Sequence, residues 1–202
     1  MRPPTVKLVT TRVAPGRPTL AARVRDAGSG VDPFSLVIGY KRVLVGAAGY
    51  DPTSGLALFP LPAAAPKLTG RTAATLEASD YQETKNVNTS GSEIMPNTAF
   101  KAVHISVAAR PAASWLAPDP SAGCVKGKVG LIVAASSPRK IASVRFYDGK
   151  RRIGTVRTGQ VGLYVATWKT GKAKRGAHTL RVVARDAGGR TASARESVRV
   201  CR

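Results

Sequence analysis

Short runs rich in Val, Ile, Leu, Thr and Ala, broken by clusters of Gly, Pro, Asp and Ser, are the feature that most restricts the fold of this chain. The turn signals recur every ~8–15 residues, and no long segment keeps the 3.6-residue period of a helix. This rhythm is typical of antiparallel sandwiches and barrels. The sequence therefore predicts an all-β fold of short strands.

The pattern predicts seven strands in each half of the chain. In the first half the expected strands are 5–10, 19–25, 36–40, 42–45, 56–59, 73–78 and 101–107. In the second half they are 114–116, 128–134, 141–147, 151–156, 162–168, 177–185 and 194–200.

The two halves also repeat one another. Gly70 precedes Asp80 by ten positions, and Gly176 precedes Asp186 by ten; in both cases a glycine turn opens an alternating strand that ends at Ala-x-Asp. Such an echo indicates two copies of one domain type. We expect domains at 1–109 and 110–202, a fairly stiff Ala/Arg/Pro linker at 108–113, and a long polar loop at 81–98.

The second half resembles the bacterial Ig-like domains that occur in arrays on secreted and cell-surface proteins. The residues that carry this resemblance are 141–150, 153–154, 164–168, 176–180 and 184–189. Within them, Asp148-Gly149 is a strong hairpin signal, and Phe146 and Trp168 supply bulky core side chains. The first half resembles the same superfamily more loosely, through 25–32. The resemblance implies two tandem immunoglobulin-like antiparallel β-sandwiches outside the cell.

The charge balance is strongly basic, with 32 Lys and Arg against 11 Asp and Glu. A formal charge of +21 favours binding to polyanions, while 43% hydrophobic residues argue against disorder. The excess is concentrated in residues 111–202, which carry +15 of it. We therefore expect partners such as anionic cell-wall polymer or polysaccharide. No apolar run is long enough to insert into a membrane.

Strand alternation predicts where the basic side chains of the second half point. Arginines on 141–147, 177–185 and 194–200 alternate with apolar residues, and in the resembled topology these three strands share one sheet. The predicted polyanion-binding residues are Arg145, Arg181, Arg185, Arg195 and Arg199, with Arg151 and Arg152 at the edge. The alternative is a merely solvated arginine face. With Tyr147 as the one aromatic candidate there, sequence-specific nucleic-acid binding is not expected.

The two cysteines are expected to form a disulfide. In the resembled topology Cys124 precedes the second strand of its domain and Cys201 ends the last strand, and these points lie at the same pole. The alternative is two free thiols in a reducing compartment.

Catalysis and metal binding are not expected. His104 and His178 lie within predicted strands, and no serine lies in a Gly-x-Ser-x-Gly elbow. No cofactor is indicated. Calcium is a minor alternative to turn capping for the loop carboxylates Asp26, Asp32, Asp80 and Glu83.

The sequence therefore predicts a non-catalytic extracellular spacer or adhesion module, monomeric and part of a longer secreted or surface protein, that tethers to anionic polymers. Its first residues lack the apolar core of a secretion signal, so we expect any such signal upstream. The alternative is the C-terminal accessory region of a secreted protease or glycosidase. A carbohydrate-binding module is disfavoured, because Trp115 and Trp168 fit core positions better than an exposed aromatic row.

Overall fold

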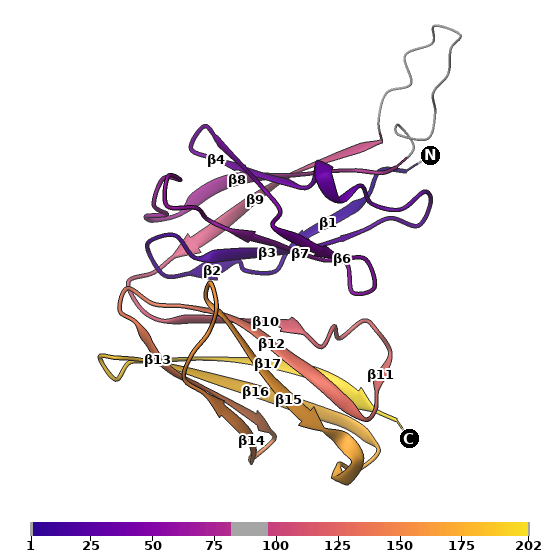
Figure 1. The fold of residues 1–202 in the computed structure, drawn as a ribbon, viewed down its shortest axis with the longest axis vertical. Helices are drawn as coiled ribbons and strands as arrows, with labels where there is room; N and C mark the ends of the chain where they lie inside the picture. The colour runs from indigo at the N-terminus through magenta and orange to yellow at the C-terminus, as the bar shows by residue number, and fades with distance from the viewer. Residues whose placement is uncertain (1, 82–96, 202) are drawn as a thin grey trace, which may run out of the picture.

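The computed structural model describes residues 2–81 and 97–201, and they form an all-β structure of stacked sheets (Figure 1). The predicted fold class, two tandem immunoglobulin-like β-sandwiches, is confirmed. Most of the long loop predicted at 81–98 lies outside the described residues. Two short 3-10 turns, η1 (Pro33–Ser35) and η2 (Thr170–Lys172), are the helical elements of the described chain, and neither could span a membrane.

The N-terminal sandwich consists of two sheets. One sheet has the strand order β1-β3-β7-β6 and the other β2-β9-β8-β4-β5. Their strands are β1 (Thr5–Leu8), β2 (Arg12–Val13), β3 (Thr19–Arg25), β4 (Val37–Tyr40), β5 (Val43–Gly46), β6 (Gly49–Asp51), β7 (Leu56–Pro60), β8 (Thr72–Ser79) and β9 (Thr98–Val107).

The C-terminal sandwich repeats this plan with a three-stranded sheet, β10-β12-β15, and a five-stranded sheet, β11-β17-β16-β13-β14. Its strands are β10 (Ala112–Ala117), β11 (Cys124–Val125), β12 (Lys128–Ser136), β13 (Ile141–Asp148), β14 (Arg151–Val156), β15 (Leu163–Lys169), β16 (Gly176–Asp186) and β17 (Thr191–Val200).

Each sandwich has its own apolar core. Phe59, Ile38 and Leu76 are fully buried in the first core, and Phe146 and Leu180 in the second. The equivalent strands β8 and β16 both reach a buried aspartate, Asp80 or Asp186. The repeat seen in the sequence therefore corresponds to the same strand in both sandwiches.

The strand count per half differs from the prediction. The short strands β2, β6 and β11 were not predicted, because two or three residues give no readable alternation. Strand β5 begins one residue later than predicted, since Lys41 and Arg42 form the hairpin turn with φ of 46° and 63°. Neither residue is a usual choice for left-handed backbone, so no turn signal is present at these positions.

The two sandwiches pack against each other face to face. Ala21 and Leu56, from the sheet β1-β3-β7-β6, share an apolar cluster with Leu116 and Ala134, from the sheet β10-β12-β15. The molecule is therefore a stack of four sheets, with these two in the middle (Figure 1). The outermost layers are the five-stranded sheets.

Polar contacts fix this junction at one end. Asp119, which follows β10, is almost fully buried and accepts hydrogen bonds from Ser121 N and Oγ at 3.0 and 2.9 Å. It also pairs with Arg25 and lies 3.4 Å from Nη1 of Arg23, both on β3. Arg23 Nη2 donates to the Leu116 carbonyl at 2.5 Å.

Further bonds tie the sandwiches at other points. Ala14 N donates to Ser136 Oγ at 2.9 Å, and Thr19 Oγ1 donates to the Val161 carbonyl. The segment between β9 and β10 is only residues 108–111. The relative placement of the sandwiches therefore rests on packed faces and on the ion pairs of the buried Asp119, in addition to a short linker.

Candidate polyanion-binding face

The outermost five-stranded sheet of the C-terminal sandwich carries the predicted arginines. Its inward side chains, among them Val144, Phe146, Leu180 and Val182, are fully buried against β10-β12-β15. Because neighbours along a strand alternate sides, the residues between them point away from the core. The outward set includes Arg145, Arg181, Arg185, Arg195 and Arg199, which we call the basic face.

The strand register aligns part of this face into a row across four strands. Arg195 of β17 lies opposite Arg181 of β16, Arg181 opposite Tyr147 of β13, and Tyr147 opposite Arg152 of β14. The Arg181 guanidinium carbon is 4.3 Å from the centroid of the Tyr147 ring, which is cation–π geometry. Arg152, expected only at the edge of the face, is thus part of its central row.

The aspartates of the C-terminal sandwich form ion pairs with residues outside the basic face. Asp119 pairs with Arg25, Asp148 with His178, and Asp186 with Arg190. Glu196 is paired with Leu180, whose side chain points into the core, so Glu196 lies on the side of the sheet opposite the basic face. Among the described residues, no ion pair neutralises an arginine of the basic face.

One arginine near this face was missed by the sequence analysis. Arg157 follows β14 directly and lines, with Arg145 and Arg185, a surface hollow of about 300 Å³. The alternation pattern offered no signal, because Arg157 lies one residue beyond the strand.

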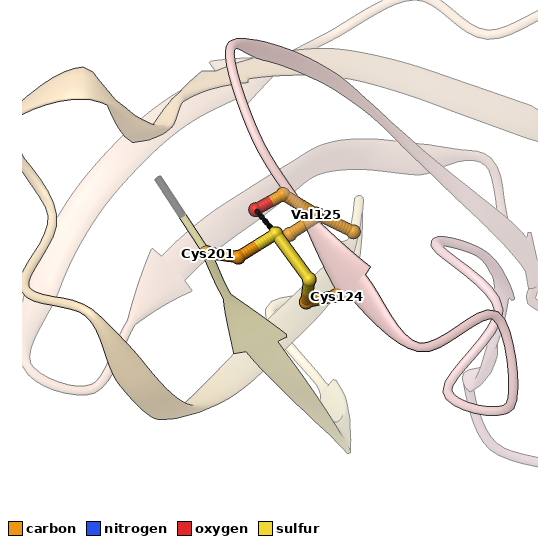
Figure 2. Close-up of a disulfide and its surroundings, with 3 residues drawn as sticks. All are labelled: Cys124, Val125 and Cys201. Carbon is orange, nitrogen blue, oxygen red and sulfur yellow. Dashed lines mark hydrogen bonds between the residues drawn. A yellow bond between two sulfur atoms is a disulfide. The ribbon is translucent and has the colours of Figure 1, made fainter.

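The predicted disulfide is present in the structure and lies at the end of the same sheet. Cys124 in β11 is bonded to Cys201 directly after β17, with a Cα–Cα distance of 5.6 Å (Figure 2). Strand β11 pairs in parallel with the end of β17, and Cys201 N donates to the Val125 carbonyl at 3.1 Å. The bridge thus anchors the last strand of the basic face.

The histidine in this sandwich has structural partners. His178 Nδ1 is 2.8 Å from Asp148 Oδ1, Nε2 is 2.7 Å from the Lys174 carbonyl, and the ring packs edge-on against Trp168. Burial lowers the pKa of His178, but the two acceptors and the Asp148 charge outweigh it, so the pKa is raised above 6.5. His104 lies exposed on β9.

The loop aspartates considered for calcium cap turns. Asp26 accepts hydrogen bonds from the backbone of Gly28 and Gly30, and Asp32 accepts one from Phe34 N. Asp80 accepts a bond from the Asn97 side chain, and Glu83 lies outside the described residues. Within residues 2–81 and 97–201, no group of three His, Cys, Asp or Glu side chains could hold a metal ion.

Both tryptophans are core residues, as the sequence analysis expected. Trp115 and Trp168 are 6% and 4% exposed, so neither presents a flat surface for stacking a sugar ring.

A second hollow lies at the junction of the sandwiches. It has a volume of about 700 Å³ and is lined by β1, β10 and β17. Arg23, Arg25 and Asp119 line it too, but they pair with one another. The basic face is the stronger candidate, because within residues 2–81 and 97–201 no ion pair involves its arginines.

Comparison with known proteins finds a family model that matches most of the C-terminal sandwich. Residues 111–182 match the family model of the bacterial Ig domain. The match runs from the start of β10 to the middle of β16, and so includes Arg145, Arg157 and Arg181. No curated protein matches the chain.

Solved structures resemble both sandwiches together. Dimeric latent PorU from Porphyromonas gingivalis is 18% identical, with a TM-score of 0.57 over 98% of this chain and 20% of PorU. The fibronectin(III)-like modules of Clostridium thermocellum CbhA are also 18% identical, with a TM-score of 0.40 over 97% of this chain and 94% of theirs. The chain spans about a fifth of PorU, and these likenesses concern the fold.

The fold and these comparisons define an immunoglobulin-like β-sandwich protein. Residues 111–182 of its second sandwich match the bacterial Ig domain, which confirms the resemblance inferred from the sequence. The likeness to PorU extends over both sandwiches and concerns the fold alone. A structural disulfide such as Cys124–Cys201 is typical of proteins outside the cytoplasm.

Proposed function

We propose that the chain is a non-catalytic extracellular module that tethers its parent protein to an anionic polymer, such as cell-wall polymer or polysaccharide, through the basic face. The observation that carries this proposal is the outward row Arg195–Arg181–Tyr147–Arg152, without a carboxylate partner among the described residues. Unneutralised cations on one sheet attract a polyanion from a distance and hold it by many weak contacts.

The position of the basic face supports tethering more than spacing. The sheet that carries it is an outermost layer, facing away from the N-terminal sandwich, so a long polymer can lie across it. The sandwiches are stacked face to face and are not joined end to end. Strand β1 begins on the side of the stack where strand β17 ends (Figure 1). The pair therefore adds little more reach than one sandwich would.

Charge reversal on the basic face tests this proposal. The double variant Arg181→Glu, Arg199→Glu is expected to bind heparin and long-chain polyphosphate at least ~30-fold more weakly, because each lost cation costs about 1 kcal/mol near an anionic surface and each glutamate adds repulsion. For the unchanged protein, binding should weaken steeply with salt. Column retention and a binding titration at several salt concentrations measure both effects.

A matched control keeps the net charge change the same. Arg71→Glu with Lys101→Glu alters two exposed cations of the N-terminal sandwich and should reduce binding far less. Equal losses in the two double variants would mean that net charge alone drives retention. That result would contradict the assignment to the basic face.

A further inference from the structure

The hollow beside Arg157 has a more specific composition than the rest of the basic face. Ser143 of β13 lies opposite Arg185 of β16, while Arg145 lies opposite Thr155 of β14. Continuing this ladder by two residues places Arg157 beside Ser143. Three arginines and two hydroxyl residues from three neighbouring strands thus line one hollow of about 300 Å³.

The charge in this hollow is almost wholly positive. Asp186 also lines it, but that carboxylate accepts from Gly188 N and Arg190 N at 2.9 Å each, from Ser137 Oγ at 3.0 Å and from Arg190 Nε at 3.1 Å. Its side chain is 0% exposed. In the described structure, Arg145, Arg157 and Arg185 form no ion pair with it or with another acid.

The donor set matches a compact anion with several oxygens. Each guanidinium presents N–H donors in a fixed fork, and a serine or threonine hydroxyl donates one more. Such forks bind oxyanions through paired hydrogen bonds. Donors that converge from three strands can serve more oxygens than the two of a single carboxylate. Three cations also favour an anion with more than one negative charge.

We propose that this hollow is a subsite for one tetrahedral oxyanion, a sulfate or phosphate group, carried by the bound polymer. The proposal rests on the proposed function and deepens it. The row through Arg181 and Tyr147 supplies general attraction, while the hollow holds one charged group and sets the position of the polymer. The module therefore prefers sulfated or phosphorylated polymers to polymers charged by carboxylates alone.

Titration of the full chain with inorganic sulfate, inorganic phosphate and acetate tests the subsite. Ionic strength is held constant with chloride, and amide and arginine Nε–H resonances are followed by NMR. Sulfate and phosphate are expected to give saturable shifts at Ser143, Arg145, Thr155, Arg157 and Arg185. Acetate is expected to bind at least fivefold more weakly.

Two single variants with the same charge change sharpen the test. Arg157→Ala, inside the hollow, is expected to weaken sulfate and phosphate binding at least fivefold. Arg152→Ala, on the same sheet but outside the hollow, should change it less than twofold. Arg157→Lys keeps the charge but loses the fork, so intermediate affinity is expected. Unchanged melting temperatures establish that the variants remain folded.

The outcomes separate the subsite from the wider proposal. Shifts that do not saturate, equal binding of acetate, or equal effects of Arg157→Ala and Arg152→Ala would overturn the subsite. If heparin binding still depended on Arg181 and Arg199, the proposed function would stand. If heparin binding did not depend on Arg181 and Arg199, the proposed function would be refuted, even if inorganic sulfate still bound in the hollow.

Discussion

Replacing both Cys124 and Cys201 with serine is expected to destabilise the C-terminal sandwich by about 4–5 kcal/mol, because the bridge closes a loop of 77 residues in the unfolded chain. The melting temperature should fall by roughly 10–20 °C. Cys124 is exposed and Cys201 half-buried, so serine itself adds little cost in packing. Calorimetry measures the effect.

Chemical reduction of the unchanged protein provides the control. It should lower the melting temperature by a similar amount, since it removes the same cross-link without altering any side chain in the core. The expectation is contradicted if the serine variant and the reduced protein have the same melting temperature as the oxidised protein. The pairing of β11 with β17 would then hold the end of the sheet without the bridge.

The second large effect is expected at the junction. Asp119→Ala removes the carboxylate that pairs with Arg23 and Arg25, leaving Arg23, whose side chain is 15% exposed, without its buried counter-ion. Breaking a buried pair is costly, but Arg25 is partly solvated, so we expect a loss of about 2–3 kcal/mol. Urea unfolding measures this loss, and X-ray scattering should show a longer molecule.

This contribution also depends on pH. Burial raises the pKa of Asp119, but hydrogen bonds from Ser121 and the charges of Arg23 and Arg25 outweigh it, so the pKa lies below its ordinary 3.8. The stabilisation is therefore fully present above that ordinary value and is lost as the pH falls through the lowered pKa. The difference in free energy of unfolding between Asp119→Ala and the unchanged protein should therefore become smaller as the pH is lowered through this pKa.

Asp26→Ala is the control for the junction, because Asp26 caps a turn within the N-terminal sandwich by accepting hydrogen bonds from Gly28 N and Gly30 N. It should leave the scattering profile unchanged. A compact Asp119→Ala protein with undiminished stability would mean that the apolar cluster alone fixes the junction.

The sequence predicts the basic face well because strand alternation is a local property. Arg145, Arg181 and Arg195 each lie between inward-facing neighbours, so their direction follows from a period of two once the strand is recognised. Which strands become neighbours is not local. That part depended on the resemblance to bacterial Ig-like domains, and the register that aligns Tyr147 with Arg181 came only from the structure.

The face-to-face junction was not predicted, although the residue patterns of two strands are consistent with it. Residues 19–22 in β3 are buried without interruption, and β12 contains the continuous apolar run 131–135. A strand buried on both sides has no reason to alternate. These runs therefore indicate a sheet covered on both faces. The covering surface comes from the other sandwich, which no local pattern identifies.

Mapping the binding of long-chain polyphosphate by NMR on the full chain tests the central claim most directly. The account predicts that amide shifts concentrate on the outward residues of β13, β16 and β17, with the largest changes near Arg145, Arg181 and Arg185. Shifts centred on the N-terminal sandwich or on the junction hollow, or spread evenly over the exposed cations, would contradict it.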